Sequence, residues 1–266
     1  MRGTTLGFIG LGAFGRFAAR HLAPHFQTVF YDPEVRDLPA PLKYWVEPAS
    51  IAEVAASDIV VLAMPVQHLS DVVRAITPLL RPGTLVLDVC SVKSEPLDIL
   101  SGLPAHVDIV GTHPVFGPQS GKRGITGLPI ALVPLRGHRT HIVKRFLREN
   151  LGLHVVVTTA EEHDRQMASV QGLTHLIAKV MLAMPQKDIW LKTATYEHLE
   201  AMLDMLRHDS DDLFRAICGH NPYVGDVVKG FFEAVEDVSD RLGVKVTGDS
   251  PLHSEGIRAI GQTLLR

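Results

Sequence analysis

Short apolar runs bounded by turn residues recur through the first 157 residues of the chain. Their length and their Val, Ile and Leu content are typical of strands buried on both faces of a parallel sheet. Helix-like stretches at residues 13–22, 69–80 and 140–151 separate several of these runs. Strand and helix therefore alternate, which predicts an α/β fold with a doubly wound parallel sheet. The predicted strands are residues 6–9, 28–31, 58–64, 84–89, 108–110, 129–133 and 154–157.

The pattern changes after Val157, where helical signals replace the short runs. Thr159 followed by Glu162 has the spacing of a capping box, and apolar residues then recur with helical period from Met167 to Met181. These signals predict a long helix over about residues 161–184, and further helices at 196–206, 211–218 and 223–242.

Two domains follow from this change of pattern. The first is the sheet domain, residues 1–158, and the second is an all-helical domain, residues 159–266. The last segment, residues 243–266, contains Gly248, Pro251 and Gly256, and its role stays open.

A glycine-rich turn lies between the first predicted strand and the first helix. Its spacing, GxGxxG, fits a dinucleotide: the first glycine allows a tight turn, the second lets backbone approach a pyrophosphate, and the third lets helix pack on strand. Asp32 ends the second strand, where a carboxylate can accept hydrogen bonds from ribose hydroxyls. The sequence thus predicts a Rossmann-type domain whose cofactor-binding residues are Gly10, Gly12, Ala13, Phe14, Gly15, Asp32, Met64 and Pro65.

The same carboxylate bears on the choice of cofactor. Asp32 would repel a 2′-phosphate, so the sequence favours NAD over NADP, while nearby Arg36 leaves tolerance of NADP open.

Composition narrows the class of protein. Of the 266 residues, 46% are hydrophobic and 21% charged, which is close to the average of globular domains and argues against disorder. The net charge of −3, without a basic stripe, disfavours nucleic acid as a partner. No uncharged apolar run approaches the roughly 20 residues of a membrane helix. Two cysteines outside any CxxC pair, Cys90 and Cys218, indicate a reducing compartment, and we expect a cytoplasmic protein without a bound metal.

Polar residues follow two further predicted strands. Ser91 and Lys93 come after residues 84–89, and His113 comes after residues 108–110. Ligands of open parallel sheets bind beyond the carboxyl ends of the strands. We therefore expect Ser91 and His113 to face the crevice that holds the cofactor.

The motifs around these residues resemble a known family. Asp88-x-x-Ser91-x-Lys93, with Gly111-Thr112-His113-Pro114-x-Phe116-Gly117-Pro118, is similar to the prephenate and arogenate dehydrogenases of tyrosine biosynthesis. The likeness extends over residues 6 to about 242. It continues at Gln171-Gly172-Leu173-Thr174-His175, Thr195-Tyr196-Glu197-His198-Leu199 and Asp209-Ser210-Asp211-Asp212-Leu213-Phe214, which are closest to the plant-type arogenate branch.

The resemblance implies an oxidoreductase that moves hydride from a cyclohexadienol to a nicotinamide while the ring carboxylate leaves as carbon dioxide. It implies His113 as the base for the hydroxyl proton, a task that suits a neutral imidazole. Ser91 would hydrogen-bond His113, the substrate hydroxyl or the nicotinamide amide, or it would simply cap a helix.

The resemblance also implies that the helical domain binds substrate and pairs two copies of the chain. It further implies substrate-binding residues, each with a structural alternative. His175 would reach the substrate or would lie on a helix face. Asp209 would attract the ammonium of arogenate, making arogenate the better substrate, or would be an acid at a helix start. Lys93 would add positive potential for an anionic substrate or would be a surface lysine. Arg207 stands two residues from Met205, the position of an arginine in bacterial members of the family.

Two other functional interpretations fit part of this pattern. A β-hydroxyacid dehydrogenase has a lysine on the long helix followed four residues later by asparagine, whereas Lys179 is followed by Ala183 here. A regulator that senses NAD without turnover would need neither Ser91 nor His113. We therefore expect a dehydrogenase with a small-molecule substrate, acting as a homodimer, with neither nucleic acid nor membrane as a partner.

Overall fold

The computed structural model of the protein describes residues 3–35, 37–185 and 189–244. Arg36 and most of the segment 243–266 therefore lie outside the described residues. The described chain divides into two compact units between His163 and Asp164.

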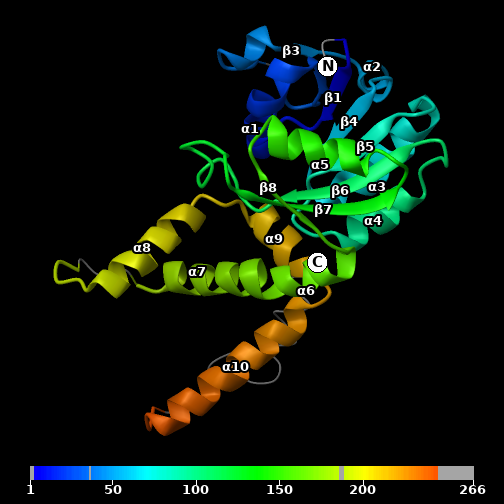
Figure 1. Ribbon diagram of the computed structural model, residues 1–266. Coiled ribbons are helices and arrows are strands. Elements are labelled where there is room, and N and C mark those ends of the chain that lie inside the picture. Colours follow the sequence, from blue (N-terminus) through cyan, green and yellow to red (C-terminus); the bar gives the residue numbers. More distant parts are fainter. Residues whose placement is uncertain (1–2, 36, 186–188, 245–266) are drawn as a thin grey trace. The chain divides into compact units, whose positions relative to one another are not determined.

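The first unit contains one eight-stranded sheet with the order β3-β2-β1-β4-β5-β6-β7-β8 (Figure 1). Each predicted apolar run forms one of its strands, because β-branched and leucine side chains fill the layers on both faces. The fold class is thereby confirmed as α/β and Rossmann-type. The strands are β1 (Thr5–Ile9), β2 (Gln27–Tyr31), β3 (Val46–Pro48), β4 (Ile59–Leu62), β5 (Leu85–Asp88), β6 (Asp108–Pro114), β7 (Pro129–Arg136) and β8 (His154–Val157).

One strand pair departs from the predicted parallel arrangement. All neighbouring strands run parallel except β6 and β7, which are antiparallel. Residues 115–128, which join them, form turns rather than a helix, and parallel strands usually need a helical crossover. The antiparallel pairing runs from Ile109 to Pro114, so β6 extends four residues beyond the predicted end at Val110.

Helices cover both faces of the sheet. On one face, α2 (Ile51–Ala55), α3 (Leu69–Ile76) and α4 (Ser94–Ser101) pack against the side chains of Val60 and Leu62. On the other face, α1 (Ala13–Leu22) and α5 (Thr140–Glu149) pack over the alternate strand residues, among them Leu6, Val61 and Leu85. Successive residues of a strand point to opposite faces of the sheet, so each strand contributes side chains to both helix-covered layers.

The apolar pattern did not predict β3, α2 or α4, because each is short. Helix α2 nevertheless carries a local signal. The Ser50 hydroxyl accepts a hydrogen bond from the backbone N–H of Glu53, and the Glu53 carboxylate accepts one from the backbone N–H of Ser50. This reciprocal capping box starts the helix.

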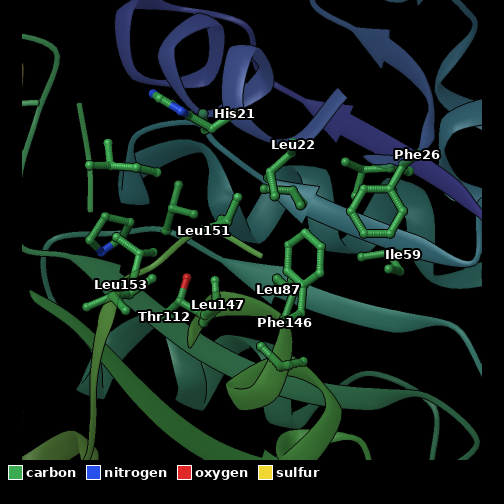
Figure 2. A pocket seen from close by; sticks show the side chains of 18 of the residues that line it. His21, Leu22, Phe26, Ile59, Leu87, Thr112, Phe146, Leu147, Leu151 and Leu153 are labelled. Carbon is green, nitrogen blue, oxygen red and sulfur yellow. The ribbon is translucent and has the colours of Figure 1, made fainter. Parts of the chain in front are cut away.

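The face covered by α1 and α5 is incompletely filled. A cavity of about 130 Å³ lies between these helices and strands β4 and β5 (Figure 2). Apolar side chains line it almost entirely, including Phe17, Leu22, Leu87, Phe146 and Leu147. An apolar cavity of this size stays dry.

The described part of the second unit is helical, as predicted. The expected helix at 161–184 forms as α6 (Ala160–Met167), the π-helical segment η5 (Ala168–Leu173) and α7 (Thr174–Ala183) in succession. The Thr159 hydroxyl accepts a hydrogen bond from the Glu162 N–H and so caps its start. Three further helices follow, namely α8 (Ala194–Leu206), α9 (Asp211–Gly219) and α10 (Val224–Arg241). Among the described residues, no helix is both long and apolar enough to cross a membrane.

Candidate active site

The glycine-rich turn joins β1 to α1 through two close backbone approaches. Gly10 has φ +90°, and a Cβ atom built there would lie 2.6 Å from the carbonyl oxygen of Ala63. A Cβ atom at Gly15 would lie 2.5 Å from the carbonyl oxygen of Gly10. Both glycines are therefore required by the turn itself, before any ligand is considered.

Gly12 differs from these two. In the described chain, no heavy atom lies within 4 Å of the position that a Cβ would take at Gly12. Gly12 and Ala13 are exposed at the N-terminus of α1, where the described residues supply no side-chain cap. The space above Gly12 and the positive end of the helix dipole fit a pyrophosphate, which supports the predicted dinucleotide site.

Asp32 follows β2 and is hydrogen-bonded to the glycine-rich turn. Its Oδ2 atom accepts a hydrogen bond of 2.6 Å from the backbone N–H of Leu11, and its Oδ1 atom accepts hydrogen bonds from Glu34 and Val35. Three backbone donors thus fix the carboxylate beside the turn. A carboxylate has about four acceptor sites, so Asp32 retains capacity for a ribose hydroxyl.

The other predicted cofactor residues lie around the same turn. Phe14 is half-buried in the first turn of α1, and its ring centroid lies 6.0 Å from that of Phe17. Met64 is half-buried just after β4, and Pro65 beyond it is exposed. These positions are compatible with contact to a dinucleotide.

The sheet register brings the predicted site residues to one edge. Ile9 pairs with Leu62, Leu62 with Asp88, and Asp88 with Gly111. The glycine-rich turn, Met64, Ser91 and His113 follow these four aligned positions within a few residues. Strands β1 and β6 are separated by β4 and β5, which amounts to roughly 14 Å across the sheet.

His113 lies within β6 and is buried, with 2% of its surface exposed. The sequence had predicted an open position after the strand; pairing of β6 with β7 through His113 and Pro114 encloses it instead. Its Nδ1 atom lies 2.8 Å from Nε2 of His163. Burial, followed by the electrostatic effects of His163 and Lys93, lowers the pKa of His113 well below its ordinary value of 6.5. His113 is therefore a neutral imidazole near neutral pH.

Lys93 is fully buried and forms an ion pair with the buried Asp88, so it is not a surface lysine. Asp88 also accepts a hydrogen bond from the Cys90 N–H, and its backbone carbonyl accepts one from the Thr112 hydroxyl. Burial raises the pKa of Asp88, and the charge and hydrogen bond of Lys93 oppose that rise. The pair brings a buried positive charge close to His113.

Ser91 is half-buried in the connection between β5 and α4. It does not cap α4, whose N-cap residue is Lys93, so the structural alternative for Ser91 is wrong. Its neighbour Cys90 packs in the interior, where burial raises the pKa of the thiol to about 12. Cys90 is thus a packing residue at neutral pH, not a nucleophile.

In the second unit, His175 and Asp209 form a partly buried polar contact. The His175 Nε2 atom lies 3.2 Å from the Asp209 carboxylate, and its Nδ1 atom lies 2.8 Å from the carbonyl oxygen of Gln171. A carbonyl only accepts, so Nδ1 carries a proton. The two contacts hold the His175 ring between Gln171 and Asp209.

Arg207 lies at the end of α8, where half of its side chain is exposed and it pairs with Asp204 at 3.3 Å. Nearby Met205 is also exposed. The structure therefore gives Arg207 a surface ion pair, and its predicted contact with substrate stays a prediction.

The sequence interpretation missed His163 and did not assign a role to Asp88. His163 precedes Met167 by four residues, so it continues the apolar face of the long helix. A histidine on that face was a detectable signal of a buried polar contact. Asp88 ends a strand that is buried on both faces, and a carboxylate in such a position indicates a buried cation or hydrogen-bond donor beside it.

Comparisons with known proteins show what the chain is similar to. Residues 32–157 match the family described as prephenate dehydrogenase, nucleotide-binding domain. Arogenate dehydrogenase 2, chloroplastic, of Arabidopsis thaliana is 29% identical over 248 residues, which are 88% of this chain and 68% of that protein. Arogenate dehydrogenase 1, chloroplastic, of the same plant is 27% identical over 253 residues, which are 89% of this chain but only 39% of that protein.

The solved structures agree on the fold. Prephenate dehydrogenase from A. aeolicus, in complex with hydroxyphenyl propionate and NAD+, matches with a TM-score of 0.68 and 18% identity. The match covers 98% of this chain and 96% of that one. The sequence matches, the motifs around Ser91 and His113 and this shared fold agree: the chain is similar to the prephenate and arogenate dehydrogenases, and residues 32–157 match the nucleotide-binding domain of that family.

Proposed function

We propose that the protein oxidatively decarboxylates arogenate or prephenate with a nicotinamide cofactor, in tyrosine biosynthesis. The observation that carries this proposal is the neutral imidazole of His113 at the sheet edge that also bears the glycine-rich turn. The relatives named as arogenate dehydrogenases support the substrate class.

The cofactor would be held by the turn between β1 and α1. Gly12 and the N-terminus of α1 would receive the pyrophosphate, and Asp32 would receive the adenosine ribose. Asp32 lies on the β2 side of the turn and His113 on the β6 side. A bound nicotinamide supplies the acceptor for the hydride of the substrate.

His113 would act as the general base. As hydride leaves the carbinol carbon, the imidazole takes the proton of the hydroxyl group on that carbon. The ring carboxylate leaves as carbon dioxide, its bonding electrons complete the aromatic ring, and the phenolate oxygen takes the proton back from His113. The buried charge of Lys93 favours the neutral imidazole that this cycle needs at its start.

NAD is the cofactor that Asp32 favours. Its carboxylate is fixed by the backbone N–H groups of Leu11, Glu34 and Val35, so it cannot readily turn away from a ribose 2′-phosphate. The resulting repulsion supports a preference for NAD over NADP.

We assign substrate binding to the second unit, through His175 and Asp209. The Asp209 carboxylate would attract the ammonium of arogenate, and the His175 side chain would reach the substrate. Arogenate should therefore give the higher kcat/KM. The Asp209→Asn variant should lose preference for arogenate by about tenfold, whereas a wild-type preference for prephenate would contradict the assignment.

The described part of the second unit also supports a homodimer. Its buried cluster is small, comprising Ala168, Ile217, Cys218 and Val224. Several large apolar side chains remain exposed on its helices, as expected for a surface that a second copy covers. They include Val180, Met205, Val235, Val238 and Leu242.

The decisive experiment follows NADH formation with arogenate and with prephenate. The His113→Asn variant should lower kcat by about 10²- to 10⁴-fold while leaving the Kd for NAD+ nearly unchanged. The His154→Gln variant, which alters an exposed histidine on β8, is the matched control. Turnover at the wild-type rate in His113→Asn would remove His113 as the base.

A further inference from the structure

The buried contact between His113 and His163 joins two segments that are 50 residues apart in the chain. His113 lies on β6 and His163 on α6, and both side chains are almost fully buried. Their rings meet edge to face, with centroids 5.0 Å apart and an angle of 71° between the planes. The Nδ1–Nε2 distance of 2.8 Å is that of a hydrogen bond.

A hydrogen bond between two neutral imidazoles requires one proton between the facing nitrogens. Either His113 donates from Nδ1, or His163 donates from Nε2. If His163 donates, His113 carries its own proton on Nε2 and can take no other there. If His113 donates, its Nε2 atom has a free electron pair and can act as a base.

We propose that His163 is a positioning residue, which accepts the Nδ1–H of His113 and so holds His113 with its basic electron pair on Nε2. This inference rests on the proposed role of His113 as the base. His163 keeps the same hydrogen bond when His113 takes the substrate proton, so the ring does not turn between the two protonation states.

A histidine suits this role better than a carboxylate does. A carboxylate beside His113 would stabilise the imidazolium and raise the pKa of His113, so that the base would already be protonated near neutral pH. A neutral imidazole orients the ring and leaves it unprotonated. Two charged groups that act on this pair, Lys93 and Asp88, are bound to each other.

Two substitutions separate positioning from simple packing. His163→Leu keeps an apolar volume in the site and removes the acceptor. His163→Gln supplies an amide oxygen that can accept the Nδ1–H of His113. His154→Gln serves again as the control for substitution of a histidine elsewhere in the first unit.

We expect His163→Leu to lower kcat by about 10²-fold, with KM and the Kd for NAD+ nearly unchanged. His163→Gln should recover kcat to within about tenfold of the wild type.

The outcomes distinguish this inference from the proposed function. Two results would overturn only the role of His163 and leave His113 as the base. One is an equal loss of kcat in His163→Leu and His163→Gln. The other is wild-type kcat in His163→Leu while His113→Asn is inactive. Full activity of His113→Asn would instead overturn the proposed base. If His163→Leu does not fold, a kcat of His163→Gln that is more than about tenfold below the wild-type value decides against positioning.

Discussion

Single buried groups around His113 control its protonation. The imidazole lies close to a positive charge on Lys93 and in contact with a second imidazole. Both disfavour the imidazolium, and burial disfavours it further. The residue is thereby kept as a base under conditions in which an exposed histidine would be partly protonated.

This protonation state makes stability depend on pH. In the unfolded chain His113 binds a proton below its ordinary pKa of 6.5, whereas in the folded protein its pKa is well below that value. Its contribution to stability is therefore complete above pH 6.5 and is lost as the pH falls below it. Urea unfolding at a series of pH values should show this decline, and His113→Asn should reduce its slope. An identical slope in both proteins would contradict the burial of a neutral His113.

The ion pair of Lys93 and Asp88 should be costly to break. Lys93→Met leaves the buried carboxylate of Asp88 without its cation, and we expect a loss of about 3–5 kcal/mol in the free energy of unfolding. The double variant Lys93→Met/Asp88→Asn removes both charges and should recover much of that loss. Urea unfolding of the two variants checks this, and equal stability of the two would contradict it.

At the scale of the elements, the sequence predicted the strands and helices that have strong apolar periodicity. It missed β3 and α2 because three or five residues are too few for a period to show. It ended β6 too early because Gly111, Thr112 and His113 are not an apolar run, although the antiparallel partner β7 pairs with all three. Long-range pairing of this kind leaves no local trace in the sequence.

The turn between β1 and α1 offers a test in which two glycines should behave differently. Gly12→Ala places a methyl group in open space, so it should leave stability nearly unchanged and weaken NAD+ binding. Gly15→Ala pushes a methyl group against the Gly10 carbonyl, so it should lower the thermal unfolding temperature as well. Calorimetry of NAD+ binding and thermal unfolding measure both effects. Equal NAD+ affinity in wild type and Gly12→Ala would argue against a pyrophosphate at this position.

At the scale of the whole molecule, the site depends on residues that the chain supplies from distant positions. The motifs around Ser91 and His113 were sufficient to predict the sheet edge on which His113 lies, and its role as the base stays a prediction. They could not reveal His163, whose contact with His113 forms only when α6 meets β6. They also could not show that Lys93 is buried, because an ion pair between Lys93 and Asp88 could equally form at the surface.

The sparse core of the second unit leads to a prediction about assembly. Wild-type protein should sediment with twice the chain mass of 29.1 kDa. Val238→Glu places a charge among the exposed apolar residues of α10 and should yield monomers, because burying that charge in an interface is costly. Val157→Glu on β8, at a similarly exposed valine, should remain dimeric. Monomeric wild-type protein would contradict the proposed pairing.

The dry space between α1 and α5 has a consequence for behaviour under hydrostatic pressure. Unfolding admits water to a void of about 130 Å³, so the unfolded chain with its hydration occupies less volume than the folded protein. The loss of this void can reduce the volume on unfolding by at most on the order of 80 mL/mol. We therefore expect pressure to lower the stability of this protein more than that of a fully packed domain of the same size. Unfolding under pressure should begin at the sheet face over β4 and β5.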